Sequence, residues 1–182
     1  MRALLLLLIP VLLVPSLAGA QSKPAPKPAA AAPAAASTAN TPKRIGKFED
    51  WTAATHVEAG QTVCYAFTTA QSSVPPVSGR GDVNLTVTER SPSRDAVAIS
   101  AGFTYAANSA VAVQADTVAM EFYTAQRSAF ARDGKAAVQA FLKGKQVLAR
   151  SPNPKGGTVT DQFSTKGFTA AYAAINKACP AK

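Results

Sequence analysis

Apolar and polar residues alternate through the middle of this chain, as they do in a β-strand with one buried face. In the segment 83–88, valine and leucine occupy every second position, and asparagine and threonine occupy the positions between them. After a Ser-Pro-Ser-Arg turn, Val97, Ile99, Ala101 and Phe103 repeat the alternation. These two segments therefore predict a β-hairpin.

Shorter apolar runs predict further strands. They cover residues 47–52, 62–68, 111–122, 128–132, 145–150 and 158–163. In 62–68, Cys64 and Ala66 face one way, and three apolar or aromatic side chains face the other. Because neither face is polar, we expect this strand to be covered on both sides, by a partner sheet and by the C-terminal helix. The only tryptophan, Trp51, should be a buried anchor.

Loops and one short helix connect these strands. A loop rich in serine, proline and glycine is expected at 71–82, and the dipeptide Asp133-Gly134 is expected to turn the chain after 128–132. Apolar residues within 136–142 then fall at helical spacing, and Gly144 follows as a C-terminal cap. This segment predicts a short connecting helix.

The last segment predicts a closing helix. Four of its residues recur at steps of four, three and four: Phe168, Tyr172, Ile175 and Cys179. This spacing places them on one helical face. Ser164 or Thr165 can cap the start of the helix, and Pro180 ends it.

The order of these elements favours a mainly β fold. Many short strands and two small helices, without regular alternation of strand and helix, are typical of an antiparallel β-sandwich and not of a parallel α/β sheet. We therefore predict a β-sandwich with a short connecting helix and a C-terminal helix.

The N-terminus predicts export. Residues 1–20 combine a basic start, a leucine-rich run and a small-residue cleavage pattern, as in a secretory signal peptide. Gln21 follows the expected cleavage site where a lipoprotein would have cysteine. Residues 21–43 form a Pro/Ala-rich linker with too few apolar side chains for a core, so the folded domain is expected at 44–182. An uncleaved signal peptide would instead tether this domain to a membrane.

The chain contains two cysteines, Cys64 and Cys179. In an exported protein they are expected to form one disulfide, because oxidising compartments favour the bond and two cysteines permit a single intramolecular pairing. The chain-entropy model gives such a long loop roughly 4–5 kcal/mol. The disulfide would tie the C-terminal helix to an early strand, and two free thiols are the alternative.

Charge is unevenly distributed along the 182 residues, whose formal net charge is +9. Residues 44–126 hold five bases and eight acids, whereas 127–166 hold eight bases and two acids. The candidate residues for binding an anionic surface are Arg127, Arg132, Lys135, Lys143, Lys145, Arg150, Lys155 and Lys166. An anionic lipid, lipopolysaccharide or an acidic glycan would be a suitable partner. A solvated surface that keeps the protein soluble is the alternative, and export makes nucleic acid a poor partner.

No group of residues has the spacing of a catalytic or metal site. His56 is the only histidine, so a multi-histidine zinc site is excluded. We expect this residue on the surface, beyond a strand end. Asp161 is in phase with Val159 and Phe163, so it should face the apolar side and bond backbone amides or cap the next helix; a ligand or catalytic role is the alternative. We therefore expect no catalytic residue, no metal, no cofactor and no enzymatic activity.

Two short motifs have simpler explanations. Arg80-Gly81-Asp82 matches an integrin-binding tripeptide, but a polar turn before a strand also accounts for it. The segment 84–86 has the form of a glycosylation sequon but lies in a predicted strand.

Several segments together resemble the invasion-associated locus B family. They are the Phe-Glu-Asp-Trp run at 48–51, Cys64 followed by tyrosine, the helix-to-strand step at Gly144, and the segment 157–179. The last of these joins a strand, a Gly-Phe helix start and a terminal cysteine in one order. The resemblance covers about 44–182.

The resemblance implies a small exported proteobacterial protein with a β-sandwich-like fold and a periplasmic or outer-envelope location. Members of the family are linked to entry into host cells, and the family supplies no catalytic residues. Many members have a cysteine shortly after the tryptophan. Thr55 occupies roughly that place here, so a local disulfide near the N-terminus is not expected.

These observations lead to a functional hypothesis. We expect an exported, non-enzymatic protein of the envelope, periplasmic, outer-membrane associated or secreted, that interacts with an envelope or host-surface component through its basic region. A structural periplasmic protein without a discrete ligand is the first alternative. An unrecognised hydrolase is the second.

Overall fold

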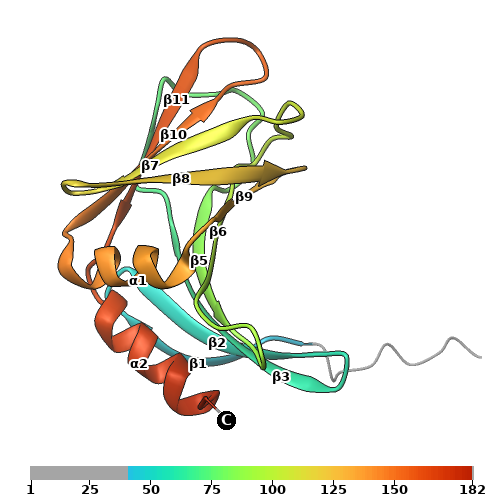
Figure 1. The fold of residues 1–182 in the computed structure, drawn as a ribbon, viewed down its shortest axis with the longest axis vertical. Coiled ribbons are helices and arrows are strands. Elements are labelled where there is room, and N and C mark those ends of the chain that lie inside the picture. The colour runs from blue at the N-terminus through green and yellow to red at the C-terminus, as the bar shows by residue number, and fades with distance from the viewer. Residues whose placement is uncertain (1–40, 182) are drawn as a thin grey trace, which may run out of the picture. The chain divides into compact units, whose positions relative to one another are not determined.

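In the computed structural model, which describes residues 41–181, the chain folds into a bent antiparallel sheet with two helices (Figure 1). The predicted signal peptide and residues 21–40 of the predicted linker lie outside the described residues. The first strand begins at Lys43.

The described part of the chain forms an eleven-stranded sheet. The strands are β1 (Lys43–Phe48), β2 (Trp51–Glu58), β3 (Gln61–Thr69), β4 (Ser72–Val74), β5 (Asn84–Glu89), β6 (Ala96–Ser100), β7 (Ala110–Ala115), β8 (Val118–Ala125), β9 (Ser128–Ala131), β10 (Gln146–Pro152) and β11 (Thr158–Ser164). Their order is β1-β2-β3-β5-β6-β9-β8-β7-β10-β11-β4, and all neighbours are antiparallel. The predicted mainly β, antiparallel fold is confirmed.

The sheet bends so that its two halves share one core (Figure 1). Trp51 of β2 and Val113 of β7 come from opposite halves and belong to the same buried cluster. Phe141 and Phe168 complete it from the two helices, with ring centroids 5.8 Å apart. Trp51 is fully buried against Phe168, so its predicted role as an anchor is confirmed.

The hairpin predicted from alternation is present as β5 and β6, in which Leu85 lies opposite Ile99. Two segments predicted as single strands are instead hairpins. The first, 47–52, contains the turn between β1 and β2, and the second, 111–122, contains the turn between β7 and β8. Glu49 and Asp116 occupy these turns at positive φ, which non-glycine residues seldom adopt and which the sequence therefore does not signal.

The faces of β3 differ from the prediction. Cys64 and Ala66 are fully buried, but Tyr65 and Phe67 are half-buried. No second sheet covers them, because residues 41–181 form one sheet that bends over the Cys64 face. The loop predicted at 71–82 also contains the short strand β4, which pairs with β11.

Helix α1 spans Gly134–Lys143. Asp133 accepts a hydrogen bond from the backbone N–H of Ala136 at 2.9 Å, so this residue is the N-cap and not part of the predicted Asp133-Gly134 turn. Gly144 is the C-cap, as predicted, and its N–H donates to the carbonyl of Ala140.

Helix α2 spans Phe168–Ala178 and packs against β1, β2 and β3. The predicted side-chain caps are wrong, because the N-cap is Gly167 at φ 83° and makes no side-chain hydrogen bond. The Ser164 hydroxyl accepts from the backbone N–H of Lys166, and the Thr165 hydroxyl donates to the carbonyl of Gly144. Both hydroxyls are therefore used at the end of β11.

The predicted disulfide is confirmed. It joins Cys64 of β3 to Cys179, the C-cap of α2, with Cα atoms 5.9 Å apart. The bond holds the end of the closing helix against the strand that the helix covers. Within residues 41–181, no helix is both long and apolar enough to cross a membrane.

Candidate functional site

The eight basic residues predicted to bind an anionic surface are all exposed. Arg132 lies 3.3 Å from the Glu121 carboxylate and over the ring of Tyr123. The other seven form no ion pair with any residue of the described part of the chain. Most of the predicted positive charge is therefore not neutralised by direct pairing.

Three of these residues come together where α1 ends and β11 leads into α2. We call Lys143, Lys145 and Lys166 the lysine junction. Its backbone is held by Thr165, whose hydroxyl donates to the Gly144 carbonyl at 2.6 Å and whose N–H donates to the Lys145 carbonyl at 3.3 Å. The β10–β11 pairing continues up to this point, since Gln146 lies opposite Ser164.

Two acidic residues lie near the lysine junction. Asp116 accepts hydrogen bonds from the backbone N–H groups of Lys145 and Gln146, at 3.0 and 3.4 Å. The backbone N–H of Asp50 donates to the carbonyl of Lys166. Neither carboxylate forms an ion pair with a junction lysine.

The remaining bases lie elsewhere. Lys155 follows the far end of β10, roughly 20 Å along that strand from Lys145 by strand geometry. Arg150 bonds Gln114 on the neighbouring strand, and Arg127 donates to the carbonyl of Gly102. Lys135 is in the first turn of α1, and Arg132 precedes that helix. The structure therefore does not gather all eight bases into one patch.

Five of the ten acidic side chains are bonded or buried within the fold. Asp133 caps α1, Asp116 accepts backbone N–H groups, and Asp95 accepts the Tyr172 hydroxyl at 2.6 Å. Glu89 and Asp161 are fully buried. Burial therefore removes Glu89 and Asp161 from the surface, whereas Asp116 and Asp133 stay exposed.

Asp161 faces the interior, as predicted, but its partner is a guanidinium. Arg80 donates two parallel hydrogen bonds to its two oxygens at 2.7 and 2.8 Å, and the Ser73 hydroxyl donates a third at 2.6 Å. Arg80 also bonds the Ala101 carbonyl and lies over the ring of Phe103, 4.7 Å from its centroid. The expected bonds to backbone amides or a helix cap are therefore wrong, because the charged pair satisfies the carboxylate.

This pair also accounts for the Arg80-Gly81-Asp82 tripeptide. The Arg80 side chain is 5% exposed and has its donors committed inside the protein. An integrin-type contact requires an accessible arginine. The structure therefore gives the tripeptide a packing role.

A second buried carboxylate, Glu89, was not identified from the sequence. It forms an ion pair with Arg94 at 2.8 Å and accepts the backbone N–H of Asp95, while its Oε1 has no hydrogen-bond partner among the described residues. Burial raises the pKa of Glu89 to about 7, and the Asp95 side chain adds to the rise. Arg94 also donates to the Cys179 carbonyl and to Asn176, which links the acid to α2. Its burial could have been found from the sequence, because position 89 continues the every-second-residue pattern of the valines and leucine in 83–87, which face the core.

His56 lies within β2, two residues before its end, and not beyond it as predicted. Its ring is edge-on to Tyr65 with centroids 5.4 Å apart, and its Nε2 lies 4.0 Å from Glu58. No group of histidine, cysteine or carboxylate side chains in residues 41–181 is arranged to hold a metal ion.

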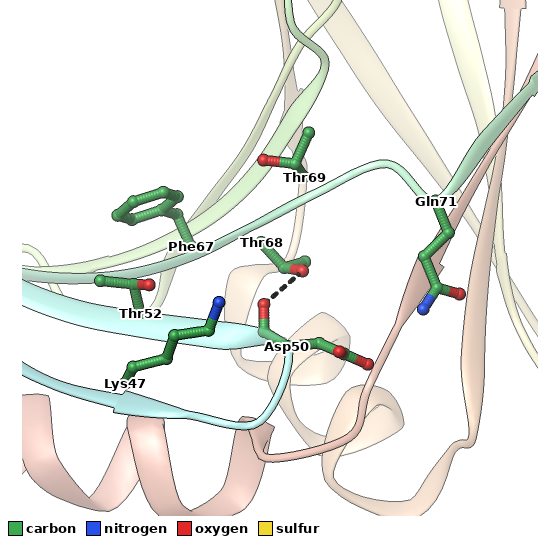
Figure 2. Close-up of a pocket in the computed structure, with 7 residues that line it drawn as sticks. All are labelled: Lys47, Asp50, Thr52, Phe67, Thr68, Thr69 and Gln71. Atoms are coloured by element: carbon green, nitrogen blue, oxygen red, sulfur yellow. Dashed lines mark hydrogen bonds between the residues drawn. The ribbon is translucent and has the colours of Figure 1, made fainter.

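A polar pocket of about 330 Å³ lies on the face of β2 and β3 opposite α2 (Figure 2). We call it the outer pocket, and it is lined by Lys47, Asp50, Thr52, Phe67, Thr68, Thr69 and Gln71. Thr52 lies opposite Lys47 on one side and Phe67 on the other in the strand register. The pocket was not visible in the sequence, because its lining comes from two hairpins and the strand end that follows them.

Comparison with known proteins identifies the family. The family model described as Invasion associated locus B (IalB) protein matches residues 51–176. The crystal structure of invasion associated protein B from Bartonella henselae is similar, with a TM-score of 0.55 and 16% identity over 73% of this chain and 95% of that chain. At this identity the similarity shows a shared fold. A comparison with curated proteins found no match. Because the family model spans more than half of the sequence, this chain belongs to the invasion associated locus B family.

Proposed function

We propose that this chain is an exported, non-enzymatic envelope protein that interacts with an anionic surface through the lysine junction. The observation that carries the proposal is that hydrogen bonds of Thr165 bring the backbone of Lys166 beside that of Lys143 and Lys145, while none of the three lysines has an ion-pair partner in residues 41–181. Family membership supports an invasion-associated envelope role. The signal-peptide pattern supports export.

The partner class follows from charge. Exposed ammonium groups are compact, strongly hydrated point charges, so they attract phosphates and carboxylates without requiring one fixed geometry. Clustering raises the local potential more than the same charges spread apart. Anionic lipid head groups, lipopolysaccharide phosphates and acidic glycans all offer suitable dense negative charge.

The proposal of a non-enzymatic role is supported by the positions of the unusual acids. Asp161 and Glu89 are both fully buried and paired with arginines. General acid or base catalysis needs a titrating group within hydrogen-bond reach of a substrate. Neither carboxylate offers that access.

Binding to phosphatidylglycerol vesicles and to lipopolysaccharide tests the proposal. The triple variant Lys143→Glu, Lys145→Glu and Lys166→Glu removes the lysine junction. The control variant Lys43→Glu, Arg44→Glu and Lys177→Glu makes the same change in net charge at exposed positions elsewhere.

We expect the junction variant to lose binding and the control to keep most of it. Equal losses in both variants would show that net charge alone drives the association. Absence of binding by the unmodified protein at low salt would contradict the proposal and favour a structural envelope role. Fractionation of native cells separately tests the periplasmic or outer-membrane location.

A further inference from the structure

The outer pocket has polar groups that the fold does not use. The Lys47 ammonium, the Asp50 carboxylate, the Thr52 hydroxyl and the Gln71 side-chain amide make no hydrogen bond or ion pair with other described residues. Figure 2 shows the side chains of Asp50 and Gln71 directed toward the same space. Together these groups offer donors and acceptors of several kinds within one concave site.

An aromatic surface lies beside these polar groups. Phe67 lines the outer pocket and is half-buried, so part of its ring is accessible. The Tyr65 ring stacks next to it with centroids 6.0 Å apart, and His56 continues the row at 5.4 Å from Tyr65. The outer pocket therefore has one aromatic wall, Phe67, beside its polar groups, and Tyr65 supports that ring from outside the pocket.

The backbone around the outer pocket is held in place. The Thr68 hydroxyl donates to the Asp50 carbonyl at 2.9 Å, which fixes the β1–β2 turn (Figure 2). The backbone N–H of Gln71 donates to the Gln162 carbonyl at 2.8 Å, which fixes the other rim. A ligand would therefore meet preformed walls, which lowers the entropy lost on binding.

We infer that the outer pocket binds a neutral pyranose unit of a glycan. A pyranose ring has a C–H face that packs on an aromatic ring and hydroxyls that both donate and accept hydrogen bonds. Phe67 would pack against the C–H face of the ring. The sugar hydroxyls would bond the Asp50 carboxylate, the Gln71 amide and the Lys47 ammonium. Asp50 adjoins the lysine junction, because its backbone N–H bonds the Lys166 carbonyl, but no junction lysine lines the outer pocket. The inference does not depend on the proposed anionic partner.

Other ligand classes fit less well. A free anion attracted by Lys47 would also be repelled by the Asp50 carboxylate in the same pocket. A peptide added as a β-strand needs a free sheet edge, but β2 and β3 are each paired on both sides. A neutral, hydroxyl-rich ligand can hydrogen-bond both Lys47 and Asp50, is not repelled by the carboxylate, and needs no free sheet edge.

An array of neutral glucose-, galactose- and mannose-containing oligosaccharides tests this inference. Binding should be measured in about 0.5 M NaCl, where charges are screened within roughly 4 Å, so that the lysine junction contributes little. We expect retention of one or more neutral oligosaccharides, followed by calorimetric titration of the best one. No neutral oligosaccharide retained would overturn the inference, as would retention of acidic sugars or peptides alone.

Variants locate the binding. Asp50→Ala and Gln71→Ala alter exposed side chains that the fold does not use, so both proteins should fold, and each should weaken binding about tenfold. Phe67→Ala should remove it. Tyr123→Ala is the matched control, because Tyr123 is an aromatic residue 44% exposed at another part of the sheet. Unchanged affinity in Asp50→Ala and Gln71→Ala would place the glycan elsewhere and overturn the inference.

Discussion

Arg80 and Asp161 lie 81 positions apart in the chain and form two parallel hydrogen bonds inside the fold. Arg80 belongs to the loop between β4 and β5, and Asp161 lies in the middle of β11. Their pairing attaches this loop to the sheet. Because the side chain of each is nearly or fully buried, the two charges depend on each other.

Removing one member of this pair should be costly. We expect Arg80→Met or Asp161→Leu alone to lower the free energy of unfolding by about 3–5 kcal/mol, since each leaves an uncompensated buried charge. The double variant should be more stable than either single variant. Urea unfolding measures all three, and a double variant destabilised by the sum of the two single losses would show that the charges do not depend on each other.

Glu89 should make stability depend on pH. Its folded pKa of about 7 lies above the ordinary value of 4.5, so the folded protein holds the proton more tightly than the unfolded chain. The free energy of unfolding should therefore fall as the pH rises from 4.5 to 7. Glu89→Gln keeps an acceptor for Arg94 and removes this titration, which should stabilise the protein by about 1–2 kcal/mol at about pH 8.

Urea unfolding of wild type and Glu89→Gln at about pH 5.5 and about pH 8 tests this prediction. The gain should be larger at the higher pH. Glu121→Gln is the control, because Glu121 forms an exposed pair with Arg132 and should change stability by less than about 1 kcal/mol. A gain from Glu89→Gln that is the same at both pH values would exclude the proposed titration.

The positive φ of Gly167 should be essential to the start of α2. A residue with a side chain would have to keep the backbone at φ 83°, and its Cβ would lie 1.9 Å from the Phe48 carbonyl oxygen. Gly167→Ala should cost more than the about 1–3 kcal/mol expected from the backbone conformation alone. Gly156 also has positive φ, but a Cβ added there would have no atom within 4 Å, so Gly156→Ala is the matched control. Melting temperatures of the two variants should differ clearly, and equal shifts would contradict the close contact.

The Cys64–Cys179 bond should be complete in protein purified without reductant. Alkylation without reduction should add no mass, and alkylation after reduction should label both thiols. Cys64→Ala should lower the free energy of unfolding by about 2–5 kcal/mol, because the bond closes a long loop. Two labelled thiols in the unreduced protein would show that the bond is absent.

The elements that the sequence predicted correctly are those formed by residues close together in the chain. Alternation in 83–88 and the helical spacing in 136–142 gave the β5–β6 hairpin and α1. The turns at Glu49 and Asp116 were missed, because a left-handed conformation at a charged residue has no clear sequence signal. For this reason the sequence predicted a single strand where the structure has the β1–β2 hairpin, and another where it has the β7–β8 hairpin.

The candidate sites depend more on tertiary contacts. The inward phase of Asp161 was visible in the sequence, but nothing local identified Arg80 as its partner. The charge count indicated a basic region, whereas the grouping of Lys145 with Lys166 depends on the pairing of β10 with β11. Composition therefore gave only the expectation of an anionic partner, and the fold showed which bases lie together.

The salt dependence of binding to phosphatidylglycerol vesicles tests the central claim most directly. Affinity should fall steeply as NaCl rises from about 0.05 M to about 0.5 M, because the screening length falls from roughly 14 Å to roughly 4 Å. The Lys143, Lys145 and Lys166 triple variant should bind weakly at every salt concentration, and the Lys43, Arg44 and Lys177 variant should follow the unmodified protein. Affinity independent of salt, or identical curves for the two triple variants, would contradict binding through the lysine junction.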